Sequence, residues 1–336
     1  MKSRTANIFR CSSTFTYNSG KMIILNQLWN KKTALDRAIG WIKKHRIGNA
    51  GIVVHHKTKE LTPEVTGYLI ESLYNAGEKE FAYDLARWEV SIQKPDGSFS
   101  APGVQTAYTF DTAQVIRGFL RLIDDLPELQ GPLVKACQFV ISQIDQKGEV
   151  HTPDDSIWIL PDGGKLSAYC NLYCLAPLLN SGKRLREQTF VNTAERSLSY
   201  YKNQPDITEF KPKLGTLSHI FGYMMEALAE MGETDLAKKG LEQAWKLQKA
   251  DGSIPAYPGV KWVCATGLAQ LGIASWMVGN REAASKALSY LEKIQNPGGG
   301  FYGGYGKGVE YFPEKEISWA NKFFIDLYLL VKGKNS

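Results

Sequence analysis

Two kinds of apolar pattern alternate along this chain, with a period of roughly 50 residues. In the first kind, apolar and small side chains occupy nearly every face of the helix, which is typical of a helix buried on all sides. In the second kind, apolar residues recur at helical spacing, and charged residues such as Glu233, Lys238 and Glu242 lie opposite them. The pattern therefore predicts a series of helical hairpins, each with one buried and one amphipathic helix.

The chain contains six stretches of each kind. Buried helices are expected at 63–75, 109–122, 168–180, 217–231, 263–278 and 318–331. Amphipathic helices are expected at 34–46, 78–93, 131–146, 188–203, 234–248 and 281–295. A lone amphipathic helix begins the series and a lone, strongly apolar helix ends it, so pairing the two would close a ring. We predict an all-α (α/α)6 toroid with six inner and six outer helices, and an open helical array is the alternative.

A repeated turn at the end of three amphipathic helices supports this periodicity. It reads QKPDGSF from Gln93, QKADGSI from Gln248 and QNPGGGF from Gln295. Pro, Asp and Gly in this arrangement stop helices and form turns. The separations of 155 and 47 residues correspond to three repeat units and one.

Composition and charge narrow the class of protein. Hydrophobic residues make up 43% of the 336 residues and charged residues 22%, so the chain can bury a substantial core. The net charge of +6 is spread without a dense basic run, so we do not expect a nucleic-acid partner. No apolar stretch approaches the ~20 residues of a membrane span. We expect a flexible polar lead over 1–30 and a single toroid domain over 31–333.

The cysteines and the start of the chain bear on the cellular compartment. The five cysteines are odd in number and contain no CxxC pair, which indicates buried thiols in a reducing environment. The first 30 residues lack the continuous apolar core of a secretory signal. We therefore expect a cytoplasmic protein. Cys170 and Cys174 are spaced for one helical face, but no third ligand follows, so no metal is expected.

In a closed ring, the N-terminal ends of the inner helices and the loops before them meet at one mouth, where we expect the functional site. Polar residues gather at these ends, although polar groups on buried helices are costly unless they line a wet cavity. The candidate catalytic residues are Glu64, Asp111, His219, Tyr223 and Glu226. The candidate substrate-binding residues are Gln114, Tyr169, Asn171, Trp262, Gln270, Tyr305, Trp319, Asn321 and Lys322.

Some of these candidates have simpler explanations. Asp111 can act as a helix cap, and Glu64 follows a proline in a first helical turn, where a carboxylate complements the helix dipole. His219, Tyr223 and Glu226 share one helix face, because their spacings are four and three residues. Glu226 lies deepest, so burial should raise its pKa, while Tyr223 or His219 is the candidate for abstracting a proton.

The candidate residues favour carbohydrate chemistry. The chain has no phosphate-binding GxxxxGK[ST] loop and no HExxH motif, and no nucleotide or metal cofactor is expected. Two carboxylates could hydrolyse a glycosidic bond as acid and base. Tyr and His could instead remove the C5 proton of a uronate while a cation such as Lys322 neutralises its carboxylate. The residues leave both reactions open.

Several segments together resemble the VpsJ-like family of bacterial exopolysaccharide and surface-glycan biosynthesis clusters. They are PEVTGYLI, TFDTAQVIRGFL, LSHIFGYMMEAL, WVCATGLAQLGIASW and ISWANKFFIDLYLL, spread over about residues 34 to 331. The resemblance implies an α/α toroid and a role in polysaccharide production. The chain departs from the family pattern FDTGQV at Ala113, while Asp111 and Gln114 are kept.

The turn motifs also resemble those of the squalene-cyclase and prenyltransferase toroids. Neither the DxDD acid of the cyclases nor the zinc ligands of the prenyltransferases occur in this chain, which disfavours terpenoid or prenyl chemistry. The same fold occurs in uronate lyases and glucuronyl C5-epimerases, which is an analogy of fold. The leading hypothesis is an enzyme that modifies or cleaves a uronate-containing oligo- or polysaccharide. The alternative is a non-catalytic glycan-binding factor that works with glycan-assembly machinery.

Overall fold

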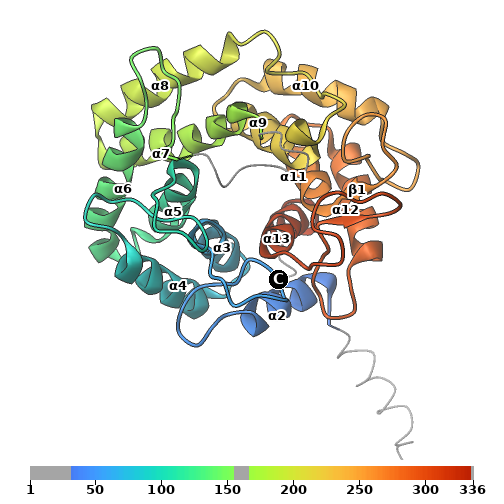
Figure 1. The fold of residues 1–336 in the computed structure, drawn as a ribbon, viewed down its shortest axis with the longest axis horizontal. Helices are drawn as coiled ribbons and strands as arrows, with labels where there is room; N and C mark the ends of the chain where they lie inside the picture. The colour runs from blue at the N-terminus through green and yellow to red at the C-terminus, as the bar shows by residue number, and fades with distance from the viewer. Residues whose placement is uncertain (1–31, 155–165, 334–336) are drawn as a thin grey trace, which may run out of the picture. The chain divides into compact units, whose positions relative to one another are not determined.

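The computed structural model describes residues 32–154 and 166–333, and within the compact unit Ala34–Ser336 the helices form two concentric rings (Figure 1). The inner helices are α3 (Pro63–Asn75), α5 (Thr109–Leu122), α7 (Leu175–Leu185), α9 (Ser218–Glu230), α11 (Ala265–Met277) and α13 (Ser318–Lys332). The outer helices are α2 (Ala34–Lys44), α4 (Lys79–Ile92), α6 (Gln130–Ser142), α8 (Gln188–Lys202), α10 (Thr234–Lys246) and α12 (Arg281–Ile294). This arrangement confirms the predicted (α/α)6 toroid.

Short elements complete the described chain. They are the 3-10 helices η1 (Pro127–Leu129), η3 (Ala168–Cys174) and η4 (Leu214–Thr216), and strands β1 (Val263–Cys264) and β2 (Gly304–Tyr305), which pair antiparallel. Within the described residues no helix is long and apolar enough to cross a membrane. The four described cysteines, Cys137, Cys170, Cys174 and Cys264, are free thiols. The predicted lead over 1–30 lies outside the described residues.

Burial separates the two rings as the sequence pattern predicts. Every residue of α11 from Ala265 to Ser275 is buried, because this helix packs between α9, α12 and α13. The outer helix α10 buries one stripe that includes Ala237 and Leu241, and its lysines face outward. The hydrophobic core therefore lies between the rings as well as inside the inner one.

The first and last helices close the ring. Helix α13 packs against both α3 and α2, which confirms the predicted pairing of the chain's two ends (Figure 1). The Trp41 indole donates to Glu316 at 2.6 Å, and Arg37 donates to Gln295 at 2.6 Å. These bonds join residues more than 250 positions apart, so the described ring depends on contacts between its two ends.

The repeated turn motif explains how closure reuses the geometry of the internal repeats. The Gln93 amide donates to Gly97 and to Pro132 on the next outer helix, and Gln248 makes the same pair of bonds to Gly252 and Ala283. Gln295 also donates to the glycine four residues on, and its second bond reaches Ala34 at the start of the chain. The last repeat therefore treats the first helix as its next repeat.

Gly299 at this closing turn provides a test of ring stability. Its φ is +91°, and an added Cβ would overlap the Arg37 carbonyl of α2. We expect Gly299→Ala to destabilise the protein by about 2–4 kcal/mol, from backbone strain and the overlap together. Gly308 is the matched control, since its φ is +80° and nothing lies within 4 Å of its added Cβ. Equal losses in urea unfolding for Gly299→Ala and Gly308→Ala would contradict this role for the closing turn.

The third inner helix differs from its predicted form. Instead of one α-helix over 168–180, the chain forms the 3-10 helix η3 and then α7, which extends to Leu185. Pro177 explains the break, because it lacks an N–H and its ring would clash with the carbonyl four residues earlier in a continuous helix. In α7 it occupies the first turn, where proline is tolerated. Cys170 and Cys174 consequently lie on a 3-10 helix and not on one face of an α-helix.

Candidate active site at the mouth of the ring

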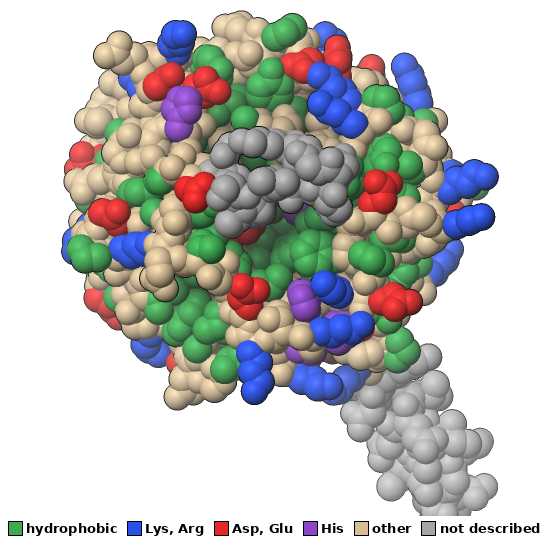
Figure 2. Space-filling model, viewed as in Figure 1, with side chains coloured by type: hydrophobic (Ala, Val, Ile, Leu, Met, Phe, Trp, Pro, Cys, Tyr) green, Lys and Arg blue, Asp and Glu red, His purple; other side chains and the backbone are tan. Residues whose placement is uncertain are grey.

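A cavity of about 770 Å³ opens where the N-terminal ends of the inner helices meet their preceding loops. Glu64, Phe110, His219 and Trp319 contribute to its wall from the starts of α3, α5, α9 and α13, and Asn171 contributes from η3. The space-filling view shows the hollow at the centre of this face, with hydrophobic side chains in its depth (Figure 2). The expected mouth is therefore a real cavity.

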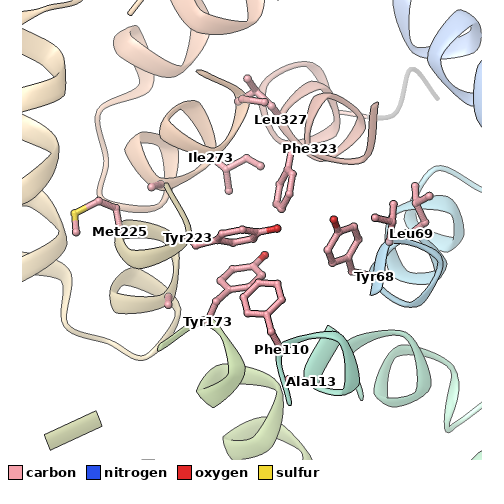
Figure 3. Packing of buried hydrophobic residues seen from close by; sticks show 14 of the residues in the cluster. Tyr68, Leu69, Phe110, Ala113, Tyr173, Tyr223, Met225, Ile273, Phe323 and Leu327 are labelled. Atoms are coloured by element: carbon pink, nitrogen blue, oxygen red, sulfur yellow. The ribbon is translucent and has the colours of Figure 1, made fainter. Parts of the chain in front are cut away.

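Aromatic rings form the floor of the cavity. Tyr68, Phe110, Tyr173, Tyr223 and Phe323 come from five different inner segments and point toward one centre (Figure 3). The ring centroids of Tyr173 and Tyr223 are 4.7 Å apart, and those of Phe110 and Tyr223 are 4.9 Å apart. We call this group the aromatic floor. It closes the axis of the ring and excludes water from the groups around it.

Glu64 is a buried carboxyl group at this floor. The Tyr223 hydroxyl donates to its Oε1 at 3.3 Å, and the side chain is 9% exposed. Burial raises the pKa of Glu64 to about 7, although hydrogen bonding by Tyr68 and Tyr223 opposes the shift. Loss of hydration thus outweighs the helix N-terminus, which would favour the charged form. A carboxyl group with this pKa can give or take a proton near neutral pH.

His219 is neutral and has a defined orientation. Its Nδ1 lies 2.5 Å from Oε1 of the buried Gln270, an amide oxygen that can only accept, so Nδ1 carries the proton. Burial lowers the pKa of His219 to about 4. Its ring lies 4.6 Å from that of Tyr223, centroid to centroid. The Nε2 lone pair is therefore left for a substrate, which makes His219 a base held in one tautomer.

Tyr223 differs from the proton-abstracting role considered for it from the sequence. Burial raises the pKa of its phenol well above the usual value, so the group stays protonated and serves as a donor. The predicted rise in the pKa of Glu226 is confirmed, because burial raises it to about 7. Glu226 nevertheless accepts its hydrogen bond from Tyr173 at 2.8 Å, while Tyr223 donates to Glu64. The three residues on one helix face thus belong to two separate hydrogen-bonded groups.

Asp111 does not line the cavity. Its neighbour Phe110 faces the ring axis, and the next residue along a helix points about 100° away. Asp111 is fully buried, and neither it nor Glu89 of α4 has a hydrogen-bond partner for its carboxyl oxygens within the described structure. Burial and then repulsion from Asp111 raise the pKa of Glu89 well above its usual value. Both groups are therefore protonated carboxylic acids between the two rings.

This pair makes the stability of the protein depend on pH. The folded state keeps the Glu89 proton to a higher pH than the unfolded chain does, so stability falls as pH rises above about 4. We expect Glu89→Met to increase the free energy of unfolding at about pH 8 by about 1–3 kcal/mol. The increase should shrink at about pH 4, where both states are protonated. The control is Glu242→Met on the exposed face of α10, which should leave the pH dependence of unfolding unchanged.

The other predicted binding residues divide between the cavity wall and the packing behind it. Asn171 and Trp319 line the cavity. Asn321 donates instead to Ala38 and Gly299 at the closing seam, and Lys322 pairs with Asp326 at 2.9 Å. The remaining residues are not part of the described wall, namely Gln114, Tyr169, Trp262, Gln270 and Tyr305.

Residues deeper along the inner helices form an ionic layer below the aromatic floor. Arg117 donates to both carboxylate oxygens of Glu230, at 2.9 and 2.7 Å, and its Nε donates to Gln114 at 3.2 Å. Arg117, Glu230 and Glu71 line a second, smaller cavity of about 360 Å³. The Gln114 side chain therefore orients an arginine and does not face the mouth.

Sequence reasoning missed the part of the wall that comes from loops. Glu60, Glu149, Tyr311 and Phe312 line the cavity from segments without helical periodicity. Their position just before an inner helix, or just after an outer one, was the available signal. Their identities could not be ranked, because loop conformation decides which side chains turn inward.

One group of described residues has the donor atoms of a metal site. Carboxylate or imidazole atoms of Asp145, Glu149 and His151 lie within 4.8 Å of one another. Asp145 Oδ1 already accepts from the Gly148 and Glu149 amides, both at 2.9 Å, and so stabilises the turn after α6. These internal bonds account for the arrangement, and we assign no metal to it.

No protein-family model matches the chain, and no curated protein matches it. Solved structures are similar over most of its length, including an alpha-amylase from Clostridium perfringens, with 15% identity over 89% of this chain and 98% of that one, at TM-score 0.70. A glycosidase variant in complex with glucose is 10% identical over 94% and 99% of the chains, at TM-score 0.67. A sugar epimerase from a ruminal bacterium is 14% identical over 92% and 99%, at TM-score 0.63. These likenesses establish the shared fold, and membership of the VpsJ-like family stays a prediction.

Proposed function

We propose that this protein is a carbohydrate-active enzyme that binds a sugar in the cavity and moves a proton at one of its carbons. The observation that carries the proposal is the pairing of a neutral His219, held as the Nδ1–H tautomer by Gln270, with the buried acid Glu64. The Tyr223 ring lies against His219 and its hydroxyl donates to Glu64, so one side chain links the base to the acid. The fold shared with glycosidases and a sugar epimerase supports a sugar substrate.

The charge of the wall favours a neutral sugar. Glu60, Glu64, Glu149 and Asp154 line the cavity, and the described part of the wall contains no lysine or arginine. Lys322, the cation considered for a uronate, is 4% exposed and paired with Asp326. A uronate carboxylate would therefore meet like charges without a compensating cation. We accordingly propose a neutral hexose unit in place of the uronate expected from the sequence.

The proposed reaction is a proton transfer next to a carbonyl group. Nε2 of His219 takes the proton from the carbon adjacent to the carbonyl of the open-chain sugar, and the C–H electrons form the carbon–carbon bond of an enediol. Glu64 donates its proton to the carbonyl oxygen, which becomes the enediol hydroxyl. Return of a proton to the opposite face of the carbon gives the epimer, and the Glu64 carboxylate takes the hydroxyl proton back. Atoms and charge balance without a cofactor.

Hydrolysis of a glycosidic bond is the second candidate. It is favoured by one observation, which is that Glu64, protonated near neutral pH, shares the wall with the exposed carboxylate Glu60. In that reaction Glu64 would protonate the leaving oxygen, and Glu60 would activate a water molecule. We propose polysaccharide production in the cytoplasm as the setting for either reaction, which follows the resemblance to glycan-biosynthesis proteins.

The test is incubation with neutral aldoses and disaccharides in D2O, followed by NMR and an assay of reducing ends. Incorporation of deuterium at the carbon beside the carbonyl, together with a new epimer, is the expected result. New reducing ends without deuterium at carbon would favour hydrolysis. Turnover only of acidic polysaccharides, with an unsaturated product absorbing in the ultraviolet, would restore the uronate hypothesis. Binding without any turnover would leave the protein a glycan-binding factor.

A further inference from the structure

An aromatic wall stands beside the proposed acid and base. Tyr311, Phe312 and Trp319 line the same cavity, from the loop before α13 and from its first turn. The ring centroids of Tyr311 and Phe312 are 4.9 Å apart, and those of Phe312 and Trp319 are 5.1 Å apart with the planes at 85°. Tyr311 also lies 6.0 Å from His219, which connects the aromatic wall to the floor of the site.

The backbone at Phe312 is strained. Its φ is +46°, a conformation that suits glycine and that bulky side chains rarely adopt. Only three described residues other than glycine have a positive φ, and they are Arg186, Phe312 and Glu314. Arg186 ends helix α7, a common place for this conformation. Phe312 has no such explanation, and strain of this kind gathers at sites where the surrounding structure imposes a functional orientation.

The neighbouring chain holds Phe312 in this orientation. A Cβ on Gly303 would lie 2.6 Å from the Cβ of Phe312, so a larger residue at Gly303 would displace the ring. The Phe312 carbonyl accepts from the Lys315 amide at 3.3 Å, and the Lys315 carbonyl accepts from the Gly303 amide at 3.2 Å. The ring remains half-buried and borders the cavity, unlike the fully buried Phe301 and Phe323. It is therefore presented to the cavity and does not fill the core.

We propose that the aromatic wall is a binding subsite for a second sugar unit, and that the substrate is an oligosaccharide of at least two units. Pyranose rings carry an apolar C–H face that packs on aromatic side chains, while their hydroxyls stay in water. A unit bound at His219 would place its neighbour against Phe312 and Trp319, because Tyr311 joins the two groups. This inference rests on the proposed function, since it assumes a sugar at His219.

The test compares sugars of increasing length by calorimetry. Glucose, maltose, maltotriose, cellobiose and cellotriose are titrated into the full-length protein and into the Phe312→Gly variant. We expect at least one disaccharide to bind more tightly than glucose. We expect Phe312→Gly to weaken binding of that disaccharide by about tenfold and to leave binding of glucose unchanged. Glycine relieves the backbone strain, so the variant should keep the thermal midpoint of the parent protein or exceed it.

Glu314→Gly is the matched control. Glu314 has a φ of +53°, is exposed and does not line the described cavity, so the variant relieves similar strain without removing a ring. Its binding should equal that of the parent protein for every sugar. Equal weakening of glucose and the disaccharides by Phe312→Gly, or unchanged binding with a lower thermal midpoint, would overturn the proposal. So would the failure of all five sugars to bind at millimolar concentration. Length-dependent binding that Phe312→Gly removes, in a protein that turns over no sugar, would retain the subsite and reject the acid–base function.

Discussion

Replacing His219 by alanine is expected to lower kcat on a neutral sugar by at least about 10²-fold, because the variant lacks the base at the cavity floor. Tyr223→Phe should cause a loss of similar size, since the Tyr223 hydroxyl donates to Glu64. Steady-state kinetics and deuterium incorporation measure both effects. His151→Ala is the control, because His151 also lines the cavity but is exposed at its rim. Parental rates in both variants, with unchanged sugar affinity, would remove His219 and Tyr223 from the mechanism.

Gln270 offers a separate test of the His219 tautomer. Gln270→Glu would place a carboxylate against Nδ1, which would raise the pKa of His219 from about 4. A larger fraction of His219 would then be protonated and unable to act as a base at acidic pH. We expect the acidic limb of the kcat/KM profile to move upward by at least about one pH unit, with activity retained at higher pH. An unmoved limb would show that His219 does not set it.

The pH profile of the parent protein should be bell-shaped, with limbs set by His219 and Glu64. Activity should rise with pH through about 4 as His219 becomes neutral, and fall through about 7 as Glu64 loses its proton. Glu64→Gln should lower kcat/KM by at least about 10²-fold and abolish the alkaline limb. Tyr223→Phe should move that limb upward, because the hydrogen bond from Tyr223 lowers the pKa of Glu64.

Glu226→Gln is the matched control for this profile. Burial raises the pKa of Glu226 to about 7 as well, but the group accepts from Tyr173 and does not line the cavity. An alkaline limb that persists in Glu226→Gln and disappears in Glu64→Gln assigns the limb to Glu64. The reverse result would place the titrating group below the aromatic floor and contradict the proposed acid.

Helix boundaries were predicted closely where the physical signal is local. The predicted spans 63–75 and 109–122 coincide with α3 and α5, because proline, threonine and glycine mark their ends and apolar residues fill their length. The third inner helix was predicted wrongly although Pro177 was visible, since its apolar residues continue through the break. Periodicity reports which residues are buried, whereas the missing N–H of proline decides where the α-helix can begin.

The sequence by itself determined that this chain forms helical hairpins and that its two end helices need each other, because apolar area and helical period are properties of the residues alone. It also placed Glu64, His219, Tyr223 and Trp319 at the mouth, since all four lie near the starts of inner helices. Only the tertiary structure turned Asp111 toward Glu89 and Asn321 toward the closing seam, because rotation about a helix axis is set by its neighbours. It also brought Phe312 into the cavity with a positive φ, which no helical pattern could indicate, because contacts with Gly303 and Lys315 impose that conformation on the loop.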